Sequence, residues 1–230
     1  MRATIIIGFH VHQIRELGAL RRSSMIGPAE IFTIFFVTLG PLKVLGPFAH
    51  RTRGLDDALV RKIAFTAFLM GAIGIIAGGF VGRALLAKWN VSIGSMAVAA
   101  GIIFFIVALR QLLEQYELPH APDAAASLPS SPVAAALRIL FPILLTPYGI
   151  ATVIVLLAAS SETTRTETIV ALLIGVMTLD LVAMLVARKI LVGVTMIVLQ
   201  ILGGVLGVLQ AALAVQFVVR GLELLKLIAG

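Results

Sequence analysis

Hydrophobic positions are grouped into six long segments that short polar stretches separate. A helix needs about 20 predominantly apolar residues to cross the hydrocarbon core of a bilayer, so each segment is long enough to span it. The pattern therefore predicts an all-α membrane protein with six transmembrane helices in a single membrane domain, residues 25–230. The six segments cover residues 28–50, 60–87, 91–113, 133–158, 166–187 and 195–222.

A polar loop and an N-terminal arm interrupt this pattern. The loop, residues 114–132, is rich in proline and divides the chain into halves of three helices, about 28–113 and 133–222. Because each half has an odd number of spans, two related halves would be inverted repeats in the membrane. The arm, residues 1–24, has only a short apolar run, and we expect it to be dispensable, with Met25 near the true start. A short amphipathic surface helix is the alternative interpretation of the arm.

Prolines interrupt the first and fourth segments at matching places. The first contains LGPLKVLGPF, residues 39–48, and the fourth contains FPILLTPYGI, residues 141–150. At 1.5 Å per residue Gly40 lies about 18 Å, and Pro142 to Pro147 lie about 14–21 Å, into a core about 30 Å thick. Interrupted segments at corresponding positions of inverted halves are a sequence sign of a transporter site. We therefore expect the first and fourth helices to be discontinuous, with residues 39–48 unwound; ordinary proline kinks are the alternative.

Composition agrees with a membrane protein and excludes several other classes. Hydrophobic residues make up 60% of the chain and charged residues 13%, against about 45–50% and 25% in soluble domains. The net charge of +7 does not indicate a nucleic-acid partner, because the basic residues stand singly or in pairs at the ends of apolar segments. Cysteine is absent, so no disulfide or thiolate metal site is expected. Three histidines lie outside the segments and His50 is the last residue of the first one, and no catalytic motif is present, so we expect neither an enzyme nor a cofactor or metal.

The distribution of Lys and Arg predicts the orientation. With both termini periplasmic and the loop 114–132 cytoplasmic, inner loops carry more basic residues than outer ones, as the positive-inside rule requires. The arm adds basic residues outside and would remove this bias, so the prediction depends on the arm being unimportant. The inner residues are Arg51, Arg53, Arg61, Lys62, Arg110, Arg138, Arg188 and Lys189. The outer residues are Arg83, Lys88, Arg165, Arg220 and Lys226, and the arm adds Arg2, Arg15, Arg21 and Arg22.

Two ionisable residues, Lys43 and Asp180, lie inside the predicted spans. A charge at the centre of a helix costs about 2.5–3.5 kcal/mol on insertion scales, so such residues usually face a cavity or a partner. Lys43 either extends toward the nearer membrane surface or lies beside a binding site. Asp180 either makes a structural hydrogen bond to a neighbouring helix or accepts a coupling proton.

Other polar and small residues in the spans are typical of helix packing. Gly74, Gly78 and Gly82 recur every four residues, a spacing that lets helix backbones approach closely. A hinge for alternating access is the alternative. Interhelical hydrogen bonds are the expected role of three glutamines in apolar surroundings, Gln200, Gln210 and Gln216.

In the order of these motifs the sequence resembles the MarC family of bacterial inner-membrane proteins, within the LysE-like transporter group, over roughly residues 28–226. The first helix of that family carries Asn/Asp-Pro-x-Gly-x-x-Pro-x-Phe. Here Pro41 and Phe48 match, while Gly40 replaces the Asn/Asp, and Lys43 and Gly46 replace the glycine and the second proline. The fourth helix of the family reads like P-x-x-x-G-P followed by A-T. Thr146 replaces its glycine, and the matching residues are Pro142, Pro147, Ala151 and Thr152.

The resemblance implies six helices in two inverted repeats and a transporter-like function. Some relatives are described as exporters of neutral amino acids. Loss of the Asn/Asp and gain of Lys43 favour an anionic substrate or a substrate carboxylate.

We therefore interpret the chain as a transporter of a small solute, a zwitterion or carboxylate, with its site between the broken helices. Amides at half-helix N-termini suit a carboxylate, and freed carbonyls suit an ammonium. The rival interpretation is a non-transporting membrane protein, such as an assembly or regulatory subunit. A homo-oligomer is compatible with either. The predicted substrate-binding residues are Gly40, Pro41, Lys43, Thr146, Pro147, Tyr148 and Gly149, and Asp180 is the candidate for proton coupling.

Overall fold

The computed structural model describes residues 27–114, 131–193 and 196–227. The arm 1–24 and most of the loop 114–132 lie outside these residues, so the expectations about them stay predictions. All regular structure in the described ranges is helical. The helices are α2 (Pro28–Leu39), α3 (Leu42–Arg51), α4 (Asp57–Lys88), α5 (Ile93–Glu114), α6 (Pro132–Ile139), the π-helical η1 (Leu140–Leu144), α7 (Pro147–Ala158), α8 (Thr163–Gly193) and α9 (Met196–Leu224).

Five candidate membrane spans are present within the described residues. They are Pro28–Arg51, which joins α2 and α3, and parts or all of α4, α5, α8 and α9; α7 is a shorter apolar helix. The predicted segment 133–158 is thus divided into α6, η1 and α7. Most predicted boundaries differ from the observed ones by no more than three residues. The exception is the C-terminal end of α8, which is Gly193 and not the predicted residue 187.

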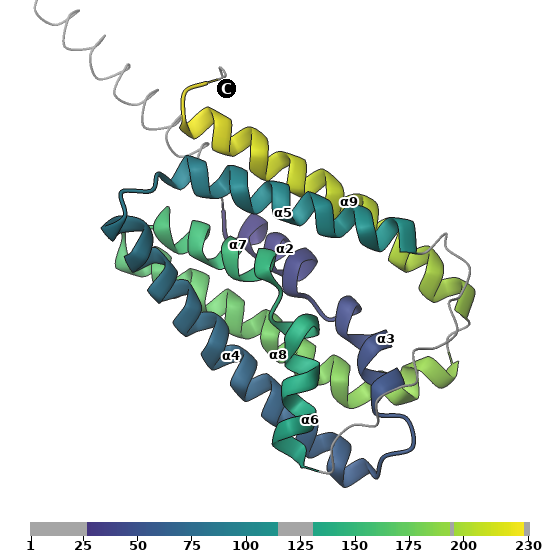
Figure 1. Cartoon of the computed structure of the whole chain (residues 1–230). Helices are drawn as coiled ribbons and strands as arrows, with labels where there is room; N and C mark the ends of the chain where they lie inside the picture. The colour runs from purple at the N-terminus through teal and green to yellow at the C-terminus, as the bar shows by residue number, and fades with distance from the viewer. Residues whose placement is uncertain (1–26, 115–130, 194–195, 228–230) are drawn as a thin grey trace, which may run out of the picture.

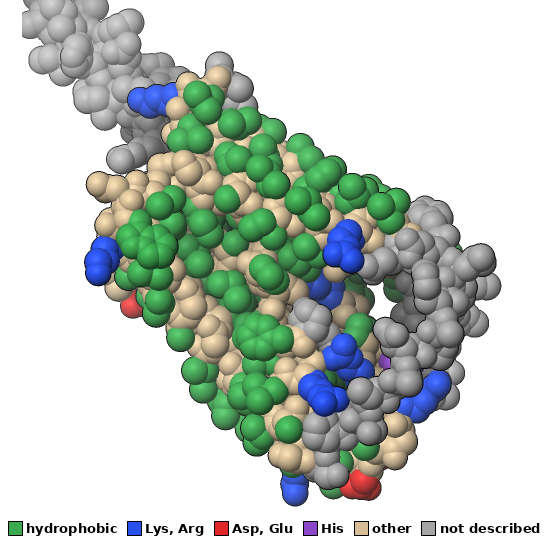
Figure 2. Space-filling model, viewed as in Figure 1, with side chains coloured by type: hydrophobic (Ala, Val, Ile, Leu, Met, Phe, Trp, Pro, Cys, Tyr) green, Lys and Arg blue, Asp and Glu red, His purple; other side chains and the backbone are tan. Residues whose placement is uncertain are grey.

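The broken helices lie between two pairs of long ones. Figure 1 shows α5 and α9 side by side along one edge, α4 and α8 toward the other, and α2 and α7 between them. The outer surface is apolar across the middle, while Lys and Arg side chains lie mainly toward the helix ends (Figure 2). Large apolar side chains such as Ile73 and Val208 are 61% and 60% exposed. An apolar exterior of this kind suits contact with lipid.

The first break occurs at Gly40 and Pro41, and no side chain would fit at Gly40. A Cβ on Gly40 would lie 1.8 Å from the carbonyl oxygen of Phe36. Pro41 has no N–H to continue the helix, and its fixed φ starts α3. The prediction that residues 39–48 are all unwound is wrong, because Leu42–Arg51 is helical with Pro47 inside it. A proline removes only one donor from the helix, and membrane helices tolerate that loss.

The second break follows η1. Phe141 has non-helical backbone angles, φ −109° and ψ 124°, inside that segment. Thr146 is extended, and its Oγ1 accepts a hydrogen bond from the N–H of Gly149 at 3.2 Å. Pro147 occupies the first position of α7, where the missing N–H has no helical partner anyway. Both predicted discontinuities are therefore present.

Glycines on α4 allow α7 to approach closely. A Cβ would lie 2.3 Å from Ile154 Cδ1 at Gly82, 3.2 Å from Leu145 Cδ1 at Gly74, and 3.7 Å from Ile150 Cγ2 at Gly78. The expected packing role is confirmed at Gly82, whereas Gly78 is at an ordinary van der Waals distance and Gly74 faces Leu145, just before α7.

A second close packing joins α5 to α9, the most extensive helix contact among the described residues. A Cβ on Gly94 would lie 2.8 Å from the carbonyl oxygen of Gly221, and one on Gly101 would lie 2.8 Å from that of Ala214. These glycines bring the two backbones nearly into contact.

Candidate functional site

The two helix breaks meet inside the protein. A Cβ on Gly149, in the first turn of α7, would lie 2.4 Å from Cδ2 of Leu39, the last residue of α2. Only glycine permits this approach. The predicted site residues of the first and fourth helices are therefore brought together.

Lys43 connects the two breaks directly. Its Nζ donates a hydrogen bond to the carbonyl oxygen of Thr38 at 2.6 Å and another to the hydroxyl of Tyr148. The ammonium also lies 4.5 Å from the centroid of the Tyr148 ring. Thr38 is in the last turn of α2, where carbonyls lack helical donors and the helix dipole is negative. These contacts hold the ammonium in the protein interior, and they do not fit a side chain that extends to the membrane surface.

Asp180 lies on α8 and is fully buried. Neither carboxylate oxygen has a hydrogen-bond partner among the described residues. Lys43 interacts with it electrostatically, without a direct hydrogen bond. Its neighbours one turn away, Met177 and Met184, are buried and apolar. Buried polar groups are almost always hydrogen-bonded, so a carboxylate without a partner inside a membrane span marks a candidate functional residue.

Tyr148 is 1% exposed, and its ring stacks on Phe104 of α5. The centroids are 4.6 Å apart and the planes differ by 11°. Sequence reasoning missed Phe104, which lies in an apolar run beside the exposed Phe105. The available signal was its position three residues after Gly101, on the side of α5 that packs closely against α9.

Buried hydroxyl and amide groups surround this centre. Thr152 Oγ1 donates to the carbonyl oxygen of Tyr148 at 2.8 Å, and Thr38 Oγ1 donates to that of Ile34 at 2.7 Å. Gln210 of α9 donates from Nε2 to the carbonyl oxygen of Val37 at 3.1 Å. This bond confirms the interhelical role expected of Gln210. The side chain of Gln200 is not among those that the structure describes.

The remaining predicted site residues shape the backbone. Gly40 is buried at the break, Pro41 starts α3 and Thr146 caps α7. Pro147 is exposed, so its part is to begin α7. Lys43, Tyr148 and Asp180 are thus the predicted residues whose polar side-chain groups are directed into the same buried region.

These features define an all-helical integral membrane protein in which two interrupted helices meet around two ionisable side chains, those of Lys43 and Asp180. The family model for MarC family integral membrane proteins matches residues 28–225. The chain belongs to this family. Neither a comparison with curated proteins nor one with solved structures gave a match.

Proposed function

We propose that this protein is a multi-pass transporter of a small solute, located in a bacterial inner membrane, with its substrate site between the two broken helices. The observation that carries the proposal is the Lys43–Asp180 arrangement. The Lys43 ammonium shares the interior where the breaks meet with the Asp180 carboxyl group, whose oxygens have no hydrogen-bond partner among the described residues. Intramembrane charges are expensive, and pathways for ions or substrates are a common reason for them.

The chemistry of the site suits a carboxylate or a zwitterion. The Lys43 ammonium is a charged donor, and the Tyr148 hydroxyl can donate or accept. Together they would receive a substrate carboxylate. Asp180 would receive a substrate ammonium or a coupling proton. Neutral amino acids carry both groups, and we propose their export as the first activity to test.

The helix contacts support two inverted repeats. The first half contains α2 to α5 and the second contains α6 to α9. The contact of α4 with α6 and α7 corresponds to that of α8 with α2 and α3, and the contact of α5 with α7 corresponds to that of α9 with α2. Contacts α5–α9 and α4–α8 join equivalent helices. A pattern that is unchanged when the halves are exchanged is expected for a two-fold axis in the membrane plane.

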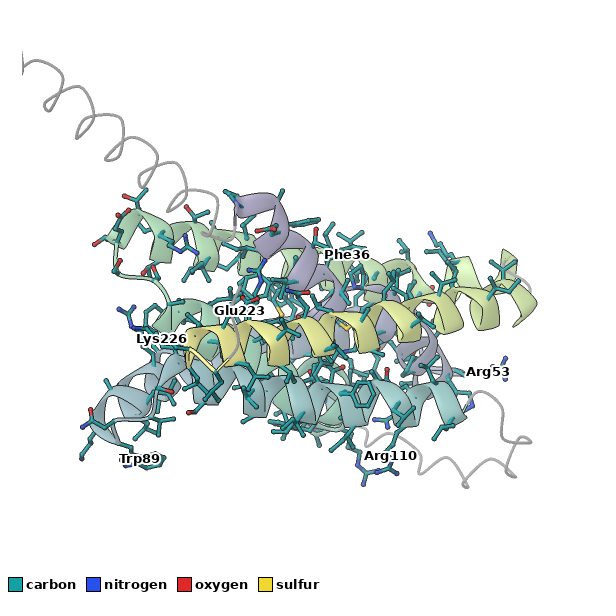
Figure 3. The ribbon with its side chains drawn as sticks, turned by 90° about the horizontal axis from the view of Figure 1, so that it is seen from above. Phe36, Arg53, Trp89, Arg110, Glu223 and Lys226 are labelled. Atoms are coloured by element: carbon teal, nitrogen blue, oxygen red, sulfur yellow. The ribbon has the colours of Figure 1, made fainter. Side chains whose placement is uncertain are left out.

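We also propose that both termini are periplasmic. Figure 3 shows Trp89 and Lys226 at one end of the molecule and Arg53 and Arg110 at the other. When the arm is left out, the end with Arg53 and Arg110 contains more basic residues than the other end. The positive-inside rule assigns the end with more basic residues to the cytoplasm.

Counterflow in proteoliposomes tests the proposal. The purified protein is reconstituted and loaded with a panel of neutral amino acids and organic anions, and exchange of labelled solute is measured. We expect exchange of at least one solute, a loss of at least ten-fold with Asp180→Asn, and no loss with Glu167→Gln, which changes an exposed residue of the same helix. A folded wild-type protein that exchanges none of the panel would support the rival, a non-transporting subunit.

A further inference from the structure

A cavity of about 400 Å³ lies between α2, α5, α7 and α9. This volume is within the range of small-molecule sites, about 300–1,000 Å³. Its walls are mostly apolar and include Ile34, Ala97 and Leu156. Three polar side chains, Glu30, Gln216 and Arg220, also line it.

Two of these residues place its mouth near water. Arg220 Nη2 and Glu30 Oε1 are 3.9 Å apart, and their side chains are 39% and 56% exposed. Glu30 is in the first turn of α2, and its Oε2 accepts a hydrogen bond from the N–H of Gly27 at 3.0 Å. Arg220 is near the end of α9. Exposed ion pairs contribute little to stability, so this one does not seal the mouth.

The inner wall of the cavity adjoins the aromatic stack. Leu213 lines the cavity and also packs against the buried cluster of Phe104, Tyr148 and Ala214. Lys43 binds the hydroxyl of the same Tyr148 and lies over its ring. The stacked rings therefore connect the wall of the cavity to Lys43.

The far end of the molecule is tied together by arginines. Arg51 donates to the carbonyl oxygen of Arg138, which joins α3 to α6. Arg188 of α8 donates to the carbonyl oxygen of Leu55 at 3.0 Å and to Asp57 Oδ1 at 2.8 Å. Hydrogen bonds thus join the helices at this end, where a separate cavity of about 740 Å³ is lined by residues such as Asp57 and Arg188.

We propose that this cavity is an outer binding chamber for the transported solute, and that the Phe104–Tyr148 stack is the barrier between the chamber and Lys43 and Asp180. The proposal rests on the proposed transport function. The chamber takes a small solute with an apolar part for its walls and an ionised group for Glu30 or Arg220. Passage to the inner site requires the two rings to separate.

Thiol labelling tests the chamber, because the native chain has no cysteine and needs no background substitutions. Ala97→Cys places a thiol on the chamber wall, and Asp180→Cys places one beyond the barrier. We expect a small, membrane-impermeant methanethiosulfonate reagent, applied to the Glu30 side, to modify the first and leave the second unmodified. An unreactive Ala97→Cys would refute the proposal that the cavity is a binding chamber.

The barrier is tested by adding a second substitution to Asp180→Cys. Phe104→Ala should increase its labelling rate at least ten-fold, and Phe104→Tyr, which keeps the stack, should not. Phe105→Ala is the matched control, because the neighbouring ring is 39% exposed. Should Phe104→Ala not fold, Phe104→Leu removes the stack with a smaller loss of volume. If the Phe104 and Phe105 variants changed the labelling rate of Asp180→Cys equally, the proposal that the stack is the barrier would be refuted. Labelling requires no turnover, so the result is independent of whether counterflow succeeds.

Discussion

The ammonium of Lys43 donates a hydrogen bond to the hydroxyl of Tyr148, 105 residues further along the chain. The same ammonium binds the carbonyl of Thr38, at the end of α2. One side chain therefore links the C-terminus of one half-helix to the first turn of another. Lys43 thus has a structural role as well as a proposed part in binding, and the two need separate measurements.

Tyr148→Phe should distinguish the contribution of the hydroxyl from that of the ring. It removes a hydrogen bond to a charged group, worth about 1.5–3 kcal/mol, and keeps the stack on Phe104. We expect counterflow to fall at least ten-fold while thermal stability in detergent falls by only a few degrees. Tyr148→Ala, which also loses the stack, should unfold at a clearly lower temperature than Tyr148→Phe. Normal counterflow by Tyr148→Phe would exclude the hydroxyl from the site.

Lys43→Met and Asp180→Asn should each impair transport far more than membrane insertion. Removing one of the two groups leaves the other without its electrostatic partner in the protein interior, which is destabilising. The double variant should therefore recover thermal stability relative to Lys43→Met, yet remain inactive in counterflow. If Asp180 carries the coupling proton, Asp180→Asn should also lose any response to a proton gradient.

Those three variants also provide the decisive negative result. Wild-type transport by both single variants would refute the assignment of Lys43 and Asp180 to the site. A double variant no more stable than Lys43→Met would show that the two charges are not coupled.

Gly101→Ala should loosen the packing of α5 on α9. Its Cβ would meet backbone atoms, the carbonyl oxygen of Ala214 at 2.8 Å and the N of Val218 at 2.9 Å, which cannot rotate away. Overpacking of this kind costs about 1–3 kcal/mol, which corresponds to a fall in Tm of about 2–12 °C. The control is Gly175→Ala on α8, where nothing lies within 4 Å. It should leave Tm unchanged or raise it, and a matching fall in both variants would contradict the close approach of α5 and α9.

Single cysteines should report the orientation. Ser161 is exposed between α7 and α8, on the predicted periplasmic side. Ser161→Cys should react with an impermeant maleimide in intact cells. Ser127→Cys, in the predicted cytoplasmic loop, should react only after the cells are opened. The reverse pattern would invert the assignment.

The sequence was sufficient to locate the spans and both breaks, because span length and proline position act locally. The extent of the first break was not predictable, since the helix resumes at Leu42 despite Pro47. The ends of α8 were also underestimated. Hydropathy marks the thickness of the membrane, whereas the α8 helix begins at Thr163, in a polar stretch outside the predicted span.

At the site, charge was the most informative signal and apolar packing the least. Lys43 and Asp180 stood out because charges in spans are rare. Phe104 and Phe105 are adjacent and chemically identical, yet one stacks on Tyr148 and the other is exposed. That difference depends on which face of α5 meets α7 and α9, and those helices lie in the other half of the chain.

The pairing of α5 with α9 also constrains how the chain is made. Most helix contacts among the described residues join opposite halves, so the first three spans have few partners when they leave the ribosome. At about 5–20 residues per second, the second half takes on the order of ten seconds to follow. During that delay Gly94 and Gly101 of α5 have no α9 to pack against. The first half must therefore remain in the bilayer without its native partners, and the native arrangement can form only after the last helix has been synthesised and inserted.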